Sequence, residues 1–248
     1  MKSRLIVFII ALVACTAACQ IEKKEITIFL AGDSTMANKP YLDGNPEKGW
    51  GQLFPLYLQN GVCVKNHARN GRSTKSFIEE GHWSNLLTQV KNGDYVIIEF
   101  GHNDSKMDSP ERYAEAYSVY TDNLQKFIRD VREKSATPIL ATPIVRRDFK
   151  EGVLVETHGD YPDAVRKVSQ EMGVVLLDLH EGTRELVSRL GEQLSKKLYL
   201  HFDSIEYINR DMKKDDTHLS SYGAFQVCDL VIRDIKTKVP ELVGYIKK

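Results

Sequence analysis

The chain has 248 residues, with 34 lysines and arginines against 34 aspartates and glutamates, so its formal net charge at pH 7 is zero. Hydrophobic residues make up 42% of it and charged residues 27%, which is typical of a globular protein and excludes a disordered or multi-span membrane chain. Because there is no positive excess to attract phosphates, we expect no nucleic-acid partner.

The N-terminal residues have the pattern of an export signal. Met1–Arg4 carries two basic side chains, and Leu5–Ala14 is a run of ten apolar residues. Such a run is about half as long as a helix that spans a bilayer. The alternative interpretation is a first core strand. We predict an export signal that is removed from the mature protein.

The signal ends in small residues that resemble the lipobox of bacterial lipoproteins, in which a cysteine is acylated and becomes the new N-terminus. Cys15 fits that pattern better because Leu12 holds the leucine position, but Cys19 also fits. We therefore expect a signal peptide with lipobox over residues 1–19 and a tether over residues 20–25. The product would be an exported lipoprotein of the bacterial envelope, periplasmic or outer-membrane anchored, whose only membrane contact is its lipid. Its formal charge would be about −2, since the signal carries two basic residues and no acidic one.

The rest of the chain alternates short apolar runs with longer amphipathic stretches. The apolar runs are expected strands over Ile26–Ala31, Val62–Asn66, Tyr95–Phe100, Pro138–Pro143 and Val174–Leu179. The amphipathic stretches are expected helices over Gly51–Gln59, Ser76–Val90, Pro110–Lys134, Tyr161–Met172, Glu181–Lys197 and Leu219–Val239. Near-continuous apolar strands suit a parallel sheet covered on both faces. We predict one α/β domain over residues 26–248, with a three-layer, doubly wound, flavodoxin-like fold around a five-stranded parallel sheet.

Two cysteines remain in this domain, Cys63 in an expected strand and Cys228 in an expected helix. We expect two buried free thiols, because two cysteines are too few for a disulfide framework or a zinc site. The polar residues form no recognisable set of metal ligands, so we expect neither a metal nor a cofactor.

The candidate site lies in the loops that follow the strands, because ligands of such sheets bind beyond the carboxyl ends of the strands. Ser34 follows the first strand in a Gly-Asp-Ser turn, and polar loops follow the second and third strands. Taken alone, Ser34 is better explained as a turn or helix-cap residue than as a nucleophile.

A nucleophilic serine needs a base and a group that orients the base. Asp215 and His218 precede the last expected helix, and an Asp three residues before a His can accept its Nδ1 proton and leave Nε2 for Ser34. Acyl transfer also needs donors for the developing oxyanion. Gly71 and Asn103 can supply them, although both are also ordinary turn formers. The conjunction of these residue types in four loops predicts an acyl-transfer site.

These motifs resemble the blocks of the SGNH (GDSL-type) hydrolases over nearly the whole mature chain. The blocks are Gly32-Asp33-Ser34, Asn70-Gly71, Gly101-His102-Asn103-Asp104 and Asp215 to His218. The resemblance implies the SGNH hydrolase fold and a metal-free serine esterase. The roles that it implies are Ser34 as nucleophile, His218 as base, Asp215 as its orienting carboxylate with Asp216 second, and an oxyanion hole of the Ser34 and Gly71 amides with Asn103.

Gly-Asp-Ser-Thr at residues 32–35 and Gly49-Trp50-Gly51 are similar to the rhamnogalacturonan acetylesterase branch, which deacetylates a galacturonate-containing pectin backbone. The resemblance implies an enzyme that acts on an acetylated acidic polysaccharide or oligosaccharide, and we expect a monomer. The residues expected to contact it are Trp50, Arg69, Arg72, His102, Arg146 and His158. An arginine fork suits a carboxylate, although surface ion pairing and core packing are the ordinary alternatives for such side chains.

Other functions stay open at this point. The chain is alternatively an esterase of other acylated sugars such as acetyl xylan, or a GDSL-type lipase or thioesterase. A sugar-binding protein on an inactive hydrolase fold is disfavoured, because Ser34, Asn103, Asp215 and His218 are all present.

Overall fold

The computed structural model describes residues 25–41, 44–202 and 214–247. The predicted signal and lipobox, with Cys15 and Cys19, lie outside the described residues, as does the tether up to residue 24. Within the described ranges, no helix has the length and apolarity that crossing a membrane requires.

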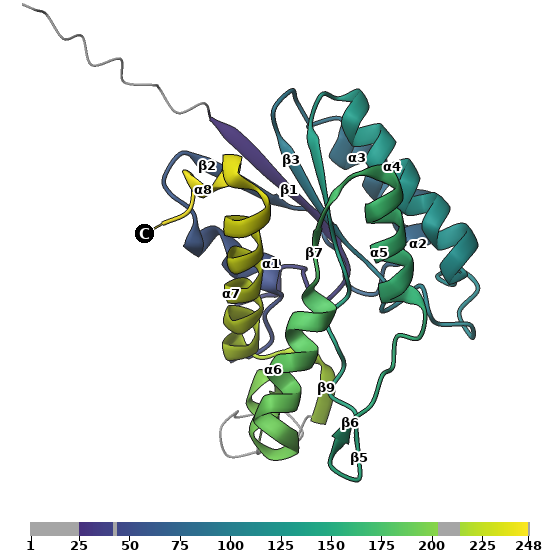
Figure 1. Ribbon diagram of the computed structural model, residues 1–248, viewed down its shortest axis with the longest axis vertical. Helices are drawn as coiled ribbons and strands as arrows, with labels where there is room; N and C mark the ends of the chain where they lie inside the picture. Colours follow the sequence, from purple (N-terminus) through teal and green to yellow (C-terminus); the bar gives the residue numbers. More distant parts are fainter. Residues whose placement is uncertain (1–24, 42–43, 203–213, 248) are drawn as a thin grey trace, which may run out of the picture.

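A five-stranded parallel sheet forms the centre of the molecule, with the strand order β2-β1-β3-β4-β7 (Figure 1). Its strands are β1 (Ile26–Gly32), β2 (Val62–Asn66), β3 (Tyr95–Glu99), β4 (Thr137–Ala141) and β7 (Val175–Leu177). In chain order this is the 2-1-3-4-5 arrangement of flavodoxin-like folds. The predicted doubly wound parallel sheet is confirmed, and every predicted strand overlaps an observed one.

Helices cover both faces of the sheet, and short antiparallel pairs extend one end. The helices are α1 (Trp50–Leu53), α2 (Thr74–Glu79), α3 (His82–Leu87), α4 (Thr121–Glu133), α5 (Tyr161–Met172), α6 (Leu179–Leu194), α7 (Ser221–Lys238) and α8 (Pro240–Val243). Shorter turns are the 3-10 helices η2 (Phe54–Tyr57) and η4 (Ser195–Leu198) and the π-helix η3 (Ala116–Tyr120). The antiparallel pairs are β5 (Phe149–Lys150) with β6 (Val153–Leu154), and β8 (Tyr199–His201) with β9 (Lys214–Leu219).

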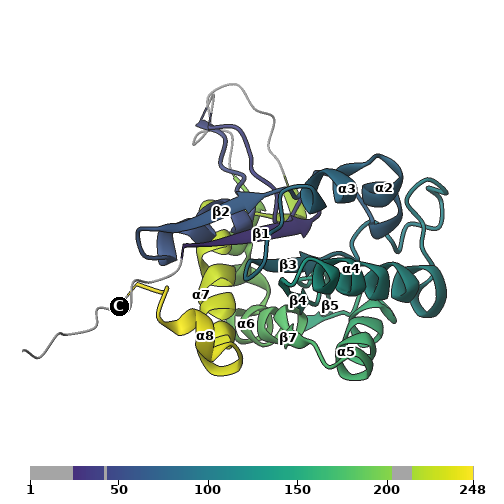
Figure 2. The ribbon, with the colours of Figure 1, turned by 90° about the horizontal axis from the view of Figure 1, so that it is seen from above.

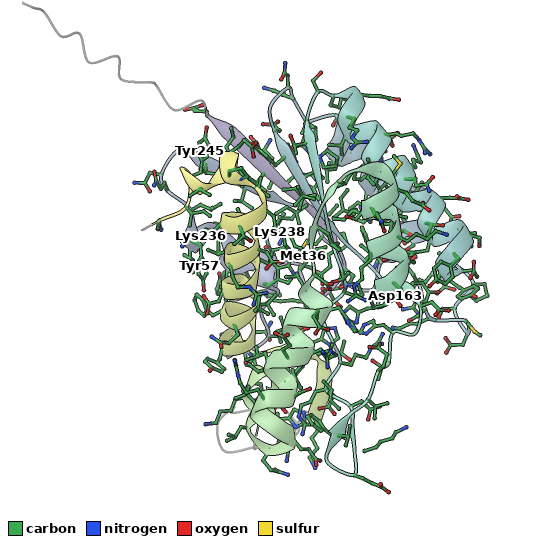
Figure 3. All side chains as sticks on the ribbon, viewed as in Figure 1. Met36, Tyr57, Asp163, Lys236, Lys238 and Tyr245 are labelled. Carbon is green, nitrogen blue, oxygen red and sulfur yellow. The ribbon has the colours of Figure 1, made fainter. Side chains whose placement is uncertain are left out.

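Alternate residues of β1 enter two separate cores, one on each face of the sheet. Ile28 and Leu30 pack under α1, α6 and α7, whereas Phe29 and Ala31 pack under α2 to α5. Figures 1 and 2 show these two helix layers on opposite sides of the strands. Met36, which follows the strand, is buried in the first core (Figure 3). Burying such side chains stabilises the fold by about 1.5–3 kcal/mol each.

Several predicted helices are shorter or broken. The stretch Ser76–Val90 is divided into α2 and α3 by Gly81, whose φ of +76° is incompatible with a continuous helix. The stretch Pro110–Lys134 becomes helical only at Ala116, because Asp104 holds the preceding loop through a hydrogen bond from Ala114. Pro55 turns the second half of the first predicted helix into the 3-10 helix η2.

The last predicted helix begins two residues later than expected. Leu219 ends strand β9, where it pairs with Tyr199, and Ser220 caps α7 by accepting a hydrogen bond from the Gly223 amide at 3.0 Å. The segment that carries Asp215 and His218 is therefore a strand.

Both cysteines of the domain are free thiols, as predicted. Cys228 is buried in α7 and donates to the carbonyl oxygen of Trp50 at 3.1 Å. The prediction that Cys63 is buried is wrong, because β2 is an edge strand and the side chain of Cys63 faces solvent.

Candidate active site

Loops at the carboxyl ends of the strands enclose a cavity of about 470 Å³. Ser34 follows β1, Gly71 follows β2 and Asn103 follows β3, while His218 comes from β9. In the sheet, β1 lies between β2 and β3. The cavity therefore lies where the strand order reverses, which is where this fold class binds ligands.

The turn that carries Ser34 is held by the buried side chain of Asp33. Its Oδ1 accepts hydrogen bonds from the amide and the hydroxyl of Thr35, both at 2.9 Å. Its carbonyl oxygen accepts the amides of Met36 and Ala37. These bonds close a tight turn and leave Ser34 at the cavity wall, with 9% of its surface exposed.

Ser34, His218 and Asp215 form one hydrogen-bonded line. The Nε2 atom of His218 lies 2.9 Å from Oγ of Ser34, and its Nδ1 atom lies 2.8 Å from Oδ2 of Asp215. The other Asp215 oxygen accepts the amides of Thr217 and His218 at 2.9 Å each. The carboxylate is thus fixed to the strand that carries the imidazole. In this arrangement an imidazole can take the serine proton while a carboxylate balances its charge.

Asp215 remains ionised in this line. Burial alone would raise the pKa of its carboxyl group, but hydrogen bonds from the His218 ring and from the amides of His218 and Thr217 outweigh it. Together they hold the pKa of Asp215 below its usual range.

Asp216, the second-ranked orienting carboxylate, does not contact His218. Asp216 instead lies 2.7 Å from Nη1 of Arg147 and 2.7 Å from Nε2 of His201. This carboxylate neutralises a buried arginine.

Gly71 and Asn103 line the cavity together with Ser34. Gly71 has a φ of +75°, and a Cβ atom there would meet nothing within 4 Å. Glycine suits this position because other residues rarely adopt this left-handed backbone conformation. Asn103 donates one amide hydrogen to the carbonyl oxygen of Arg72 at 3.0 Å, which leaves its second hydrogen for a ligand.

Of the six predicted substrate contacts, only His102 and Arg146 are among the described residues that line the cavity. Trp50 is fully buried and donates from Nε1 to Glu99 at 2.5 Å. Arg72 pairs with Glu80 at 2.8 Å, and Arg69 is exposed outside the cavity wall. His158 is 2% exposed and lies behind His102, with Nε2 of His158 3.1 Å from Nδ1 of His102.

Three cationic residues at the cavity, Lys39, Lys106 and Arg112, were not predicted from the sequence. Lys39 is buried and pairs with Glu47 at 2.8 Å. Lys106 comes three residues after Asn103 in the same loop, so its position in that loop was the available signal. The direction of a loop side chain, however, follows from tertiary packing and not from a periodic pattern.

Two buried carboxyl groups, those of Glu99 and Asp104, accept hydrogen bonds from residues around the cavity loops. Thr35 donates to Oε1 of Glu99 at 3.3 Å, and Thr74 donates to Asp104 through its amide at 2.8 Å and its hydroxyl at 2.6 Å. Burial raises the pKa of Glu99 to about 8 and that of Asp104 to about 7. Through its hydrogen bonds with Thr74, Asp104 joins the loop after β3 to the start of α2.

Residues 30–224 match the model of the GDSL-like lipase/acylhydrolase family. A rhamnogalacturonan acetylesterase of Bacillus subtilis is 40% identical over 216 residues, which cover 86% of this chain and 91% of that protein.

Solved structures share the fold. The crystal structure of the Bacillus subtilis protein YxiM superposes with a TM-score of 0.75 at 25% identity, over 90% of this chain and 58% of that larger chain. An acetylxylan esterase of Geobacillus stearothermophilus superposes with a TM-score of 0.61 at 15% identity, over 85% of this chain and 94% of that chain.

Proposed function

Because the chain belongs to the GDSL-like lipase/acylhydrolase family and is a carboxylic ester hydrolase, we propose a specific reaction for it. We propose that it is a serine esterase that removes acetyl groups from rhamnogalacturonan. The observation that carries the proposal is the line from Ser34 through His218 to Asp215. It ends on the same cavity as Gly71 and Asn103.

In the proposed reaction, Ser34 Oγ attacks the acetyl carbonyl carbon while His218 Nε2 takes the hydroxyl proton. The amides of Ser34 and Gly71 and the side chain of Asn103 donate to the oxyanion. The bond to the sugar oxygen then breaks, and His218 returns its proton to that oxygen. Water attacks the acetyl-enzyme with His218 again as base, which releases acetate and restores Ser34.

The charge of the cavity supports an acidic sugar as substrate. The described part of its wall carries the cations Lys39, Lys106, Arg112 and Arg146 against one carboxylate, Glu47, which Lys39 neutralises. Burial lowers the pKa of the Lys106 ammonium, and the nearby charges of Arg112 and Arg146 lower it further. Cations gathered in this way are stabilised by an anion. A galacturonate carboxylate is such an anion, and the Bacillus subtilis relative is named for a polymer that contains it.

Replacement of the nucleophile tests the chemistry. We expect Ser34→Ala to lower the rate of 4-nitrophenyl acetate hydrolysis by roughly 10⁴-fold or more, with an unchanged circular dichroism spectrum. Full activity in this variant would contradict the assignment.

The substrate is tested by acetate release by the unmodified protein from acetylated rhamnogalacturonan, xylan and homogalacturonan. Equal rates would remove the pectin-backbone part and leave the esterase, and faster cleavage of octanoyl than of acetyl esters would favour a lipase-type enzyme.

The cation cluster is tested separately with Lys106→Gln. We expect kcat/KM to fall about tenfold on acetylated rhamnogalacturonan oligosaccharides, as for loss of one partly buried ion pair, and to stay unchanged on 4-nitrophenyl acetate. The matched control is Lys126→Gln, which removes an exposed lysine of α4 that pairs with Asp130. Equal losses on both substrates would contradict a role in carboxylate binding.

We also propose that the protein is exported as a monomeric lipoprotein and meets its polymer in the bacterial envelope. This rests on the sequence of residues 1–19, with Cys15 or Cys19 as the acylated residue.

A further inference from the structure

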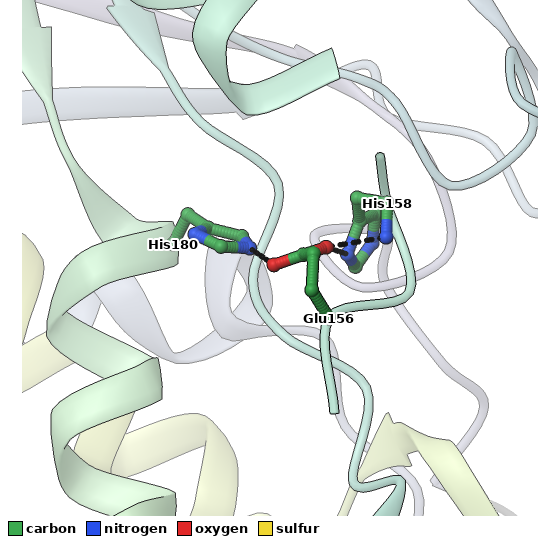
Figure 4. A group of neighbouring side chains, drawn as sticks. All are labelled: Glu156, His158 and His180. Atoms are coloured by element: carbon green, nitrogen blue, oxygen red, sulfur yellow. Dashed lines mark hydrogen bonds and ion pairs between the residues drawn. The ribbon is translucent and has the colours of Figure 1, made fainter. Parts of the chain in front are cut away.

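A cluster of three side chains, Glu156, His158 and His180, lies next to the proposed catalytic cavity. The imidazole of His102 separates it from the cavity. Figure 4 shows the Glu156 carboxylate between the two rings. Its Oε2 atom lies 2.7 Å from Nε2 of His180, and its Oε1 atom lies 3.7 Å from Nδ1 of His158. One ligand-type atom from each residue lies within 4.8 Å of the other two. We propose that these three residues bind a divalent metal ion of the zinc class, at a site separate from the catalytic residues.

The donor set selects the kind of ion. Two imidazole nitrogens and one carboxylate oxygen suit Zn²⁺, Co²⁺ or Ni²⁺, whereas Mg²⁺ and Ca²⁺ prefer oxygen ligands. A tetrahedral ion with bonds of about 2.1 Å places its ligand atoms about 3.4 Å apart. Oε2 of Glu156 faces His180 at 2.7 Å and Oε1 faces His158 at 3.7 Å, and one ligand atom from each residue lies within 4.8 Å of the other two. Binding an ion would require side-chain rotations that bring these atoms to that separation.

The burial of the three residues suits a bound ion with a route from solvent. The side chains of His158 and His180 are 1% and 7% exposed, while that of Glu156 is 45% exposed. The buried Nε2 atom of His180 makes no hydrogen bond, since its short contact with Glu156 lacks hydrogen-bond geometry. A buried ring nitrogen without a hydrogen bond is available as a ligand.

The ligands are held by a second set of contacts. The other ring nitrogen of His158, Nε2, lies 3.1 Å from Nδ1 of His102, and such a contact fixes the orientation of a metal-binding imidazole. His180 lies in the first turn of α6, where its amide donates to Thr142 at 2.8 Å. With an ion on Nδ1, His158 keeps its proton on Nε2 and donates it to His102, whose own proton then lies on Nε2. The ion thus sets the tautomer of a ring in the cavity wall.

Direct binding of Zn²⁺ and Co²⁺ to the full mature chain, after removal of metal with a chelator, tests the proposal. We expect one equivalent of Zn²⁺ by titration calorimetry, the visible bands of four-coordinate Co²⁺, and no binding of Mg²⁺. Glu156→Gln and His180→Gln should each weaken Zn²⁺ binding by at least tenfold, since even loss of a supporting contact costs about 10- to 100-fold. The controls are His82→Gln, which removes a surface imidazole beside Glu80, and His218→Gln, which removes the proposed catalytic base. Both should bind normally.

The proposal is overturned if the unmodified chain binds no Zn²⁺. It is equally overturned if the Glu156→Gln/His180→Gln double variant, shown to be folded by circular dichroism, binds Zn²⁺ as tightly as the unmodified chain. Loss of the site in His218→Gln alone would place the ion at the catalytic residues instead. Because these measurements do not involve ester hydrolysis, their outcome is independent of the proposed function.

Discussion

Asp215 and Asp216 are neighbouring carboxylates with different partners, and this difference can be measured. We expect Asp215→Asn to lower kcat by roughly 10³- to 10⁴-fold, because the imidazole loses the acceptor of its Nδ1 proton. Asp216→Asn should keep kcat within a few fold and lower the free energy of unfolding by about 1–3 kcal/mol, because it removes the ion pair of the buried Arg147. Kinetics with 4-nitrophenyl acetate and urea unfolding of both variants provide the check. A larger rate loss in Asp216→Asn would reverse the assignment.

Glu99 predicts a pH dependence of stability. Burial and the charge of Asp33 raise the pKa of Glu99 to about 8, against the opposing hydrogen bond from Trp50. A folded-state pKa above the unfolded value means that the folded protein binds the proton more tightly, so the free energy of unfolding falls as pH rises from about 5 to about 8.

Glu99→Gln keeps a neutral side chain at this position and should reduce that fall. Urea unfolding at a series of pH values measures it. Part of the slope should remain, because Asp104 has a pKa raised to about 7 and titrates in the same window. An undiminished slope in Glu99→Gln would show that Glu99 is ionised throughout.

At the scale of residues, sequence reasoning identified the side chains that follow strands but not which loop side chains face the cavity. Ser34, Gly71 and Asn103 were placed because a parallel sheet brings strand ends together. His218 was placed because Asp215, three residues earlier, can accept its Nδ1 proton. Trp50 was misplaced. A Cβ at either neighbour, Gly49 or Gly51, would lie 2.2–2.6 Å from the backbone around Met36. Because the backbone approaches so closely here, the Trp50 indole lies in the core. The local sequence pattern does not predict this.

At the scale of elements, the start of α7 depends on a close backbone contact. A Cβ at Gly223 would lie 1.9 Å from the carbonyl oxygen of Leu198. Gly223→Ala should therefore lower the free energy of unfolding by about 3 kcal/mol. Activity should fall too, because β9 and His218 directly precede this turn. The control is Gly182→Ala in the first turn of α6, where the nearest atom is a flexible Leu230 methyl group at 3.2 Å. Its effect should stay within about 1 kcal/mol, and equal stability of the two variants in urea would contradict the argument.

Helix α5 was predicted with both ends correct, because its signals are local. Pro162 lies in its first turn, and Gly173 follows it with a φ of +58°. Strand β9 was missed because its sequence, Lys-Asp-Asp-Thr-His-Leu, shows no alternation of apolar residues. The strand forms only by pairing with β8, which is a tertiary contact. Some of the other breaks follow from glycines inside apolar patterns. Gly191, for example, has a φ of +68° within α6.

At the scale of the whole molecule, the cations of the cavity belong to a mature chain whose expected formal charge is slightly negative. Attraction to an acidic polymer is therefore expected from the cations of the cavity and not from the net charge of the chain. This attraction should weaken with ionic strength, and only for charged substrates.

Tyr57 lies on the α7 side of the sheet (Figure 3), where its hydroxyl donates to Asp229 of α7 at 2.7 Å.

The proposed anchor also concerns the whole molecule. Expression of the full chain in a bacterial host with labelled fatty acid should give a labelled protein in the membrane fraction. Cys15→Ala should abolish the label if Cys15 is the acylated residue, and Cys19→Ala if Cys19 is. Label that persists in the double variant would contradict the lipobox.

The contact between Ser34 and His218 joins residues 184 positions apart, from the turn after the first strand to a strand near the end of the chain. A chain that leaves a ribosome or a translocation pore N-terminus first therefore exposes Ser34 long before His218 exists beside it. Closing a loop of this length also delays the pairing until most of the sheet has formed. We therefore expect the proposed hydrolytic site to be assembled late in folding, and a chain interrupted before its last strand to be inactive.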